Sequence, residues 1–261
     1  MGNISMPKEL TAFLTAEWRY LVMLNFEIDP EILNRYVPQG TELDSWNGRT
    51  YVSIVGFRFL NTKLLGMKIP FHRHFSEVNL RFYVRRKSGD EWRRGVVFIK
   101  EIVPLPAVTL IARWVYHENY VTLPMRHQIE FPEAMGDRRG SIAYSWKWGG
   151  QWMKLAADVS GEPQPLSPDS EEQFITEHYW GYTSQRDGGT MEYGVEHPSW
   201  RVWPVAESRF DCNVASLYGS EFAEVLSRPP TSAFVADGSE IVVRAGTRLT
   251  ADMPEFERRN A

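Results

Sequence analysis

Several features that mark common protein classes are scarce or missing in this sequence. The 261 residues include one cysteine, Cys212, so no internal disulfide can form, which is typical of a protein of the reducing cytoplasm. The 29 lysines and arginines form no basic tract and the net charge is −4, so we expect no nucleic-acid partner. The longest apolar run, 102–112, is roughly half as long as a membrane-spanning helix, and we expect no membrane partner.

The motifs of common cofactor and hydrolase sites are also missing. The sequence has no glycine-rich phosphate loop, no G-x-S-x-G turn, no H-E-x-x-H and no C-x-x-C, so we expect no cofactor. His72 and His74 form an H-x-H pair that, with Glu77 nearby, could bind a metal. The pair has no signature spacing, and the cations Arg58 and Arg73 disfavour a divalent ion, so we predict that the protein needs no metal.

Aromatic residues, by contrast, are abundant, at 13% of the chain with ten tryptophans. Aromatic and β-branched residues favour strands, and aromatic side chains also line pockets. Strand-like runs alternate with turn signals, and hairpins are expected around 87–90, 149–150, 185–189 and 237–239. Successive hairpins imply antiparallel pairing. We therefore predict one domain over residues 1–261, mainly β, with an antiparallel barrel-like sheet.

A few short helices are expected between the strands. Asp29 can cap a helix that has Pro30 at its first position. A second helix can follow Pro106, although the β-branched residues of that segment weaken the prediction. A third is predicted over 220–227, before two prolines end it.

Polar side chains recur on one face of the expected strand at 75–84. Because side chains alternate along a strand, Glu77, Asn79 and Arg81 share a face. The first expected strand places Arg19 on the same face as the apolar Leu21 and Met23. If both faces line one cavity, Arg19 and Glu77 lie within reach of each other or of a shared ligand.

Glu101 lies within an apolar run and is expected beside Val97 and Ile99. One interpretation is a buried ion pair with an arginine such as Arg19 or Arg81, since buried charges are usually paired. The other is a carboxyl group in a cavity wall, whose raised pKa suits a general acid or base.

Two further residues have both a functional and a purely structural interpretation. Lys100, expected beside Phe98, could be a reactive amine if desolvated, or a lysine whose stem covers apolar surface. The run 174–183 is expected as a strand that places His178 and Trp180 on one face. That face is either an aromatic ladder over the core or a pocket wall with His178 as its polar group.

The chain resembles the YqjF-like family of conserved bacterial proteins over nearly its whole length. The likeness is carried by TAEWRYLVMLNFEIDPEIL, VPQGTELD, YVSIVGFRF, FSEVNLRFYV, GVVFIKEIVPLPAV, FITEHYWGYT and HPSWRVWPV. More distantly, it resembles the acetoacetate decarboxylase-like superfamily. That resemblance implies a mainly antiparallel β barrel or cone that encloses a pocket.

The distant resemblance assigns candidate site residues position by position. Arg19, ten residues before Asp29, falls on the active-site arginine of acetoacetate decarboxylases. Glu77, in FSEV, falls on an active-site glutamate, and Ser53 stands where a second active-site glutamate would be. These positions are expected to lie in the pocket.

The same resemblance indicates that the reactive amine is missing. Acetoacetate decarboxylases carry their Schiff-base lysine and a second lysine after a proline, in a stretch like RELxxxPKK. Here the stretch is KEIVPLPAV, in which Glu101 and Pro106 match but Ala107 and Val108 replace the lysine pair. Alanine and valine cannot form an imine, and neither can lower the pKa of a neighbouring amine as the second lysine is thought to do. We therefore predict that the protein is not a Schiff-base decarboxylase.

Together these observations predict a cytoplasmic protein with a small-molecule pocket inside a β barrel. The expected ligand is a small organic acid. Its candidate contacts are Arg19, Ser53, Glu77, Glu101 and His178. Two function classes stay open: a binding or sensing protein without chemistry, and a lyase or hydrolase-type enzyme that uses Glu77 or Glu101 as general acid or base without an imine. The expected partner is a small molecule, with a homo-oligomer left open.

Overall fold

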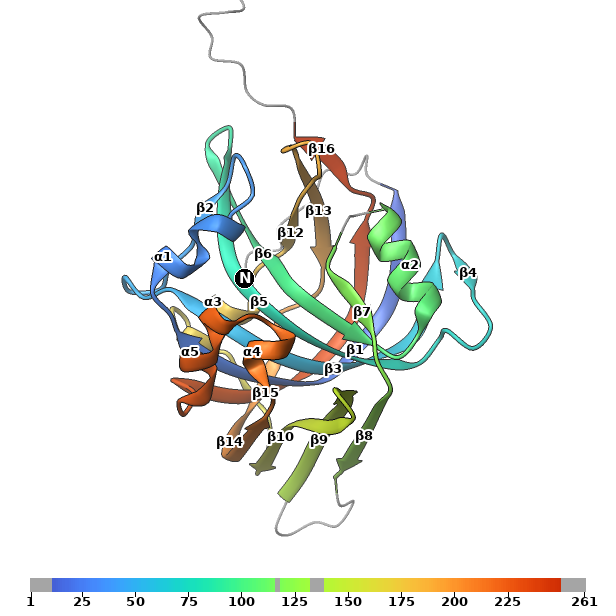
Figure 1. The fold of residues 1–261 in the computed structure, drawn as a ribbon, viewed down its shortest axis with the longest axis vertical. Coiled ribbons are helices and arrows are strands. Elements are labelled where there is room, and N and C mark those ends of the chain that lie inside the picture. Colours follow the sequence, from blue (N-terminus) through green and yellow to red (C-terminus); the bar gives the residue numbers. More distant parts are fainter. Residues whose placement is uncertain (1–10, 116–117, 132–138, 250–261) are drawn as a thin grey trace, which may run out of the picture.

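The computed structural model describes residues 11–115, 118–131 and 139–249, and its centre is a closed barrel of seven strands (Figure 1). The barrel strands are β1 (Ala12–Glu27), β3 (Tyr51–Leu64), β5 (Phe75–Ser88), β6 (Glu91–Val103), β12 (Trp180–Ser184), β13 (Thr190–Glu196) and β15 (Ser232–Arg244). Their order is β13-β12-β6-β5-β3-β1-β15, and β15 pairs again with β13. Every barrel pair is antiparallel except β12 with β6, so the predicted mainly β, barrel-like fold is confirmed.

A second group of strands continues from β15 and lies beside the barrel (Figure 1). It contains β14 (Arg201–Asp211), β10 (Gln151–Ser160), β9 (Arg139–Trp148) and β8 (Met125–Glu130). Short strands pair at the edges: β2 (Glu42–Leu43), β4 (Met67–Lys68), β7 (Tyr120–Thr122), β11 (Gln164–Pro165) and β16 (Thr247–Leu249).

The helices are short and lie in the connections between strands. They are α1 (Pro30–Leu33), η1 (Asn34–Tyr36), α2 (Pro106–Val115), α3 (Glu171–Thr176), α4 (Val214–Leu217), η2 (Ser220–Phe222) and α5 (Ala223–Ser227). The helices expected after Asp29, after Pro106 and over 220–227 all form, and the Asp29 side chain accepts the Glu31 N–H as predicted for a cap. None of the helices within the described ranges is long and apolar enough to cross a membrane.

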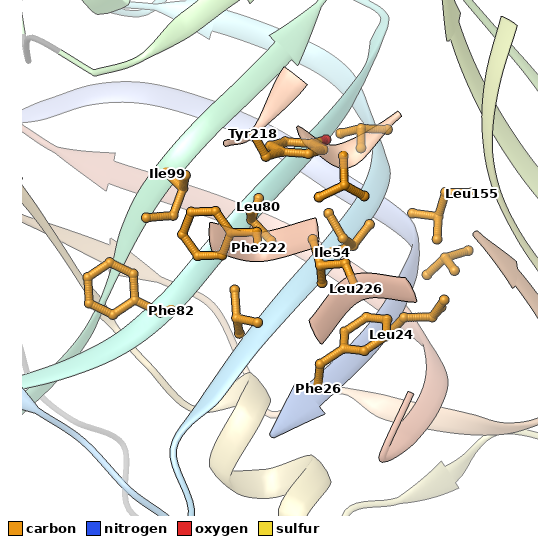
Figure 2. Packing of buried hydrophobic residues seen from close by; sticks show 14 of the residues in the cluster. Leu24, Phe26, Ile54, Leu80, Phe82, Ile99, Leu155, Tyr218, Phe222 and Leu226 are labelled. Atoms are coloured by element: carbon orange, nitrogen blue, oxygen red, sulfur yellow. The ribbon is translucent and has the colours of Figure 1, made fainter. Parts of the chain in front are cut away.

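Two apolar clusters lie on opposite sides of the barrel wall. The outer cluster joins the barrel to the second group of strands and to α4 and α5, and includes Leu80, Ile99, Leu155 and Phe222 (Figure 2). The inner cluster is built from aromatic and aliphatic side chains of the barrel interior, Phe57, Phe59, Phe75 and Tyr83 among them. The barrel wall is therefore covered on both faces, and the aromatic excess of the sequence lies partly inside the barrel.

Three of the four expected hairpins are confirmed, at 87–90, 149–150 and 185–189. The fourth, at 237–239, is wrong because β15 runs without a turn through these residues and pairs with β1 along most of its length. Gly238 has φ +76°, but this conformation serves a close approach to β1 and not a chain reversal. A Cβ at this position would lie 1.9 Å from the Trp18 carbonyl oxygen, so only glycine fits.

A β-bulge in β1 changes which side chains face the barrel interior. The pairing of β1 with β3 shifts register between Arg19 and Val22, and Tyr20 adopts φ 58°. One extra residue on β1 lets Trp18 and Leu21 both face inward, whereas Arg19 and Tyr20 face outward. The prediction that Arg19 shares a face with Leu21 is therefore wrong.

A second bulge acts in the same way in β6. The pairing with β5 shifts between Leu80 and Arg81, which leaves Ile99 as the extra residue. Phe98 and Glu101 both face the interior, although they are three positions apart. Ile99 belongs to the outer cluster, so the expected grouping of Glu101 with Ile99, and of Lys100 with Phe98, is wrong (Figure 2).

We predict that Gly238→Ala destabilises the protein more than Gly150→Ala. Both glycines have positive φ, a conformation that costs another residue about 1–3 kcal/mol. A Cβ at Gly150 meets nothing within 4 Å, whereas one at Gly238 collides with the backbone of β1. Urea unfolding of the two variants measures the difference. Equal losses of unfolding free energy would contradict the proposed role of Gly238 in the contact with β1.

Candidate functional site

A cavity of about 210 Å³ opens inside the barrel, and most of its lining is apolar. Its aromatic wall comes from β1 and β3, where the ring centroids of Trp18 and Phe57 lie 5.3 Å apart and those of Trp18 and Phe59 lie 5.9 Å apart. Phe75 stacks on Phe59 at 4.6 Å, and Trp200 adds an edge contact to Trp18. Against this apolar background, a few polar side chains define the chemistry of the cavity.

Glu77 is the central polar group of one cavity wall. It lies on β5 directly opposite Phe57 of β3, and the residue is only 2% exposed. Its Oε1 accepts a hydrogen bond of 3.0 Å from Asn79 Nδ2, and its Oε2 accepts one of 3.2 Å from the Tyr120 hydroxyl. Burial raises the pKa of Glu77 to about 7, and these hydrogen bonds act in the opposite direction.

Two more buried glutamates line the same cavity. Glu101, on β6, stands opposite Asn79, and Glu118 precedes β7 and accepts a hydrogen bond from the Tyr193 hydroxyl. Burial raises the pKa of Glu118 to about 7, and burial together with the neighbouring carboxyl groups raises the pKa of Glu101 further above its usual range. No sequence pattern indicates Glu118, because it lies outside any alternating strand pattern.

The Tyr120 hydroxyl lies between two of these carboxyl groups. It donates to Glu77 and is also a hydrogen-bonding neighbour of Glu101. A phenol has a single proton, so it can serve both oxygens only if one of the two carboxyl groups is itself protonated. The higher pKa of Glu101 makes it the protonated partner, which leaves Glu77 as the group that can take up or release a proton near neutral pH.

Arg81 also lines the cavity and is its positively charged group among the described arginines and lysines. Its Nη2 donates a hydrogen bond of 3.4 Å to the Ile175 carbonyl, and its guanidinium carbon lies 5.7 Å from the centre of the Tyr83 ring. Its Nε is buried and has no hydrogen-bond partner. Among the residues that the structure describes, no carboxylate lies within ion-pair distance of Arg81.

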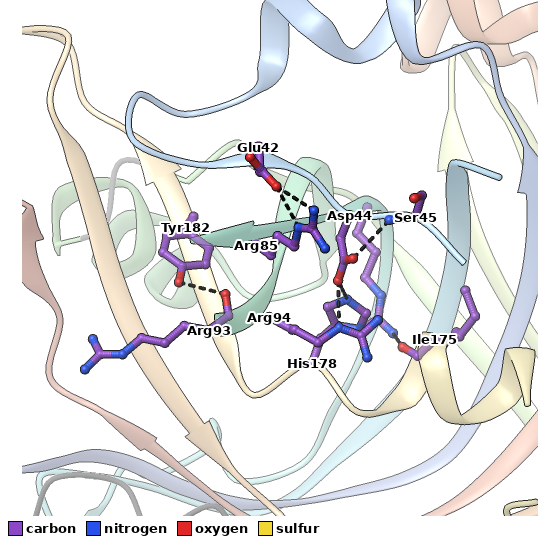
Figure 3. Close-up of polar contacts among 10 residues, drawn as sticks. Glu42, Asp44, Ser45, Arg85, Arg93, Arg94, Ile175, His178 and Tyr182 are labelled. Carbon is purple, nitrogen blue, oxygen red and sulfur yellow. Dashed lines mark hydrogen bonds and ion pairs between the residues drawn. The ribbon is translucent and has the colours of Figure 1, made fainter. Parts of the chain in front are cut away.

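His178 is held by an acidic partner, Asp44 (Figure 3). The charge of Arg81 also acts on its imidazole. Its Nε2 lies 3.2 Å from Asp44 Oδ2, which also accepts a hydrogen bond of 2.7 Å from Arg94 Nε. The His178 and Arg94 hydrogen bonds outweigh burial and lower the pKa of Asp44 to about 2, so Asp44 is an acceptor and His178 Nε2 carries the proton. Burial lowers the pKa of His178 to about 4, and the imidazole is therefore neutral.

The structure brings together three of the five predicted contact residues. Glu77, Glu101 and His178 line the cavity, but Arg19 and Ser53 do not. The Arg19 guanidinium donates to Glu17 and to the Gly238 carbonyl, so the expected pair with Glu77 is wrong. Ser53 is fully buried and donates to Asn25 at 2.7 Å. The Arg19 side chain is therefore bound outside the cavity. Ser53 lies on the inner face of the barrel as the cross-strand neighbour of Arg81, but its hydroxyl is already hydrogen-bonded, also to Tyr83 at 2.7 Å.

The run 174–183 also differs from the prediction. Its first part is the end of α3, which begins after Ser170, whose side chain accepts the Gln173 N–H. Only from Trp180 does it form a strand. His178 therefore reaches the cavity from the connection between α3 and β12, and not from an alternating strand face.

Ala107 and Val108, at the start of α2, line the cavity where the resemblance places the lysine pair. Lys100 does not replace that pair, because its Nζ donates to the Leu217 carbonyl on the outer side of the barrel wall. No lysine occurs among the described residues that line the cavity.

His72 and His74 do not point to a common centre. His72 Nδ1 donates to the Pro70 carbonyl, whereas His74 Nδ1 accepts the Asn61 N–H. Within the described ranges, no group of three or more His, Cys, Asp or Glu side chains is arranged to hold a metal ion.

Comparison with solved structures places this barrel among acetoacetate decarboxylase-like folds. Acetoacetate decarboxylase from Legionella pneumophila matches 95% of this chain and 93% of its own with a TM-score of 0.61 at 13% identity. The enduracididine biosynthesis enzyme MppR matches 94% of this chain and 92% of its own with a TM-score of 0.63 at 14% identity. Likeness at this identity shows the fold alone.

Sequence comparison defines the family more closely. The Bacillus subtilis (strain 168) protein named "Uncharacterized protein YqjF" is 27% identical over 197 residues, which are 75% of this chain and 77% of that protein. The model of the family DUF2071, described as "Uncharacterized conserved protein", matches residues 15–240. The chain belongs to this family.

We predict that Glu77→Gln removes part of the pH dependence of stability. Because folding raises the pKa of Glu77 from 4.5 to about 7, its protonated form contributes stability that is fully present below pH 4.5 and is lost as the pH rises through about 7. Glutamine cannot ionise, so the variant should gain stability relative to wild type between about pH 5 and about pH 8. Urea unfolding at about pH 5 and about pH 8 measures the difference in unfolding free energy between the variant and the wild type. The exposed Glu207→Gln is the control, and a Glu77→Gln difference that is independent of pH would contradict the assignment.

We predict that no imine forms between this protein and a β-keto acid. The cavity lining offers Ala107 and Val108 where an amine would be needed. Mass spectrometry after borohydride reduction with acetoacetate should therefore show the unmodified mass. A reduced adduct on Lys100 or on another lysine would contradict the prediction.

Proposed function

We propose that this protein binds a small organic acid in the barrel cavity and that Arg81 holds the carboxylate. The observation that carries the proposal is the guanidinium of Arg81, which lines the cavity without a carboxylate partner among the described residues. The Nε of Arg81 is buried without a hydrogen-bond partner, which is costly, and a ligand carboxylate would supply the partner. The planar fork of an arginine suits two parallel hydrogen bonds to such a group.

The surroundings of Arg81 favour an anion. His178 and His197, which also line the cavity, are neutral because burial lowers the pKa of each to about 4. The two neutral histidines place no positive charge beside Arg81 that would compete with it for an anion. Asp44 already accepts from both His178 and Arg94. The aromatic wall from β1 and β3 would cover the apolar part of the ligand.

The name of one structural neighbour agrees with this ligand class. MppR is described in a complex with pyruvate, a small oxo acid. At 14% identity this agreement supports the ligand class by fold analogy only. The contacts of Arg81 in this chain remain the main support for the proposal.

A second candidate function is acid–base catalysis without an imine, of the lyase or hydrolase type. The observation that favours it is the hydrogen-bonded series Glu101–Tyr120–Glu77, in which Glu77 can exchange a proton near neutral pH. With pyruvate as ligand, Glu77 would take a methyl proton while the C–H electron pair forms the enolate. In deuterated water, this step would exchange the methyl hydrogens, which NMR detects. Exchange that persists at the same rate in Glu77→Gln would refute this candidate.

We predict that Arg81→Gln weakens carboxylate binding by roughly ten- to a hundred-fold, as expected for the loss of a charge-assisted hydrogen bond. Calorimetric titration with valerate and pyruvate measures the affinity. Arg19→Gln is the matched control, because Arg19 is also partly buried but binds Glu17 outside the cavity. An unchanged affinity in Arg81→Gln, or an equal loss in both variants, would refute the role of Arg81.

We also predict that carboxylate affinity falls as the pH rises through about 7, because Glu77 and Glu118 then ionise inside the cavity and repel the anion. The titration is repeated at about pH 6 and about pH 8, where a carboxylic acid ligand is ionised throughout. Glu77→Gln should flatten this dependence. An affinity that rises with pH in wild type would contradict the arrangement of charges described above.

A further inference from the structure

The cavity wall around Glu77 is rich in hydrogen-bond acceptors, and none of the described cations lies within ion-pair distance of its carboxyl group. Asn79 is 1% exposed, and its Oδ1 has no hydrogen-bond donor, although its Nδ2 is bound to Glu77. Glu101 Oε2, on the neighbouring strand, is likewise buried and without a donor. Both residues line the cavity, so two unsatisfied acceptors stand next to the Glu77 carboxyl group.

These acceptors fit a nitrogen cation better than they fit a metal ion. The acidic side chains do not converge as metal ligands, because no group of three or more His, Cys, Asp or Glu in the described ranges could hold a metal. An ammonium group has three N–H donors that can reach acceptors in different directions. Phe57 is the cross-strand neighbour of Glu77 and contacts Trp18, so aromatic rings, which attract cations, lie in the wall next to the Glu77 carboxyl group.

We infer that the ligand of this cavity carries a protonated amine, which lies against Glu77, Asn79 and Glu101. The inference deepens the proposed function and rests on it for the other end of the ligand, the carboxylate at Arg81. Glu77 and Arg81 are four residues apart on β5, so their Cα atoms are separated by roughly 13 Å. The ligand class is therefore an amino acid whose amine and carboxylate lie at opposite ends of a carbon chain.

The charged groups that face Glu77 determine how amine binding depends on pH. Glu118 acts on it from the segment before β7, Tyr120 from β7 and Arg81 along β5, while Glu101 of β6 is linked to it through Tyr120. A bound ammonium would stabilise the ionised form of Glu77 and release its proton. Amine affinity should therefore rise with pH, opposite to the fall expected for a simple carboxylate.

The test compares four small molecules on the wild-type protein by calorimetry: valerate, amylamine, δ-aminovalerate and δ-hydroxyvalerate. The hydroxy acid controls for size and for a neutral donor at the same position. We expect δ-aminovalerate to bind at least about ten-fold more tightly than valerate and δ-hydroxyvalerate at about pH 8. Its affinity should be lower at about pH 6, and titrations in two buffers of different ionisation enthalpy should show proton release on binding.

Two variants test whether the tighter binding of δ-aminovalerate depends on the acceptor Glu77. Glu77→Gln should remove the advantage of δ-aminovalerate over valerate and leave valerate binding in place. Glu17→Gln, on a glutamate that binds Arg19 outside the cavity, should leave the advantage unchanged. The wild-type comparison decides the question even if Glu77→Gln fails to fold.

Each pattern of results has a distinct meaning. If the acids bind but the amine brings no gain, the inference is overturned and the proposed function stands. If amylamine binds and no acid does, the proposed function fails and the amine site stands. If none of the four binds, both are overturned.

Discussion

The interior of this barrel depends on two β-bulges, one in β1 and one in β6. Each inserts one extra residue into its strand. As a result, Trp18 and Leu21 both face the interior although they are three positions apart, and the same holds for Phe98 and Glu101. Without the bulges, strict alternation would point one residue of each pair away from the cavity, for example Trp18 of the aromatic wall or Glu101. The bulge in β1 is matched by Gly238, which lets β15 approach the Trp18 carbonyl.

Burial then sets the electrostatics of the cavity. Glu77, Glu101 and Glu118 share a site without a cation partner among the described residues, so the low dielectric favours their neutral forms. Burial keeps His178 neutral, and the Arg81 guanidinium has no carboxylate partner among the described residues. One cavity thus holds protonatable carboxyl groups and, on the same strand as Glu77, a cation without such a partner, which is the basis for a ligand with two polar ends.

The fold is that of acetoacetate decarboxylase-like barrels, but the described residues that line the cavity include no lysine. Ala107 and Val108 occupy the cavity wall at the start of α2, and Lys100 is bound on the outer side of the sheet. Glu77 and Glu101 line the interior. The described part of the cavity therefore combines carboxyl groups with an absence of lysine, and the fold alone does not define a reaction.

The sequence by itself determined most of the barrel strands, three of the four expected hairpins and the cap at Asp29, because turn residues, caps and alternation are local signals. The expectation that the lysine pair is missing came from the resemblance to acetoacetate decarboxylases. Only the tertiary structure decided that Arg81, and not Arg19, is the arginine of the cavity, and that Glu118 and the Asp44–His178 pair belong to the site. A bulge depends on how a strand pairs with its partner strand, and the pKa of a side chain depends on neighbours that are distant in sequence. Neither can be predicted from the alternation of side chains along one strand.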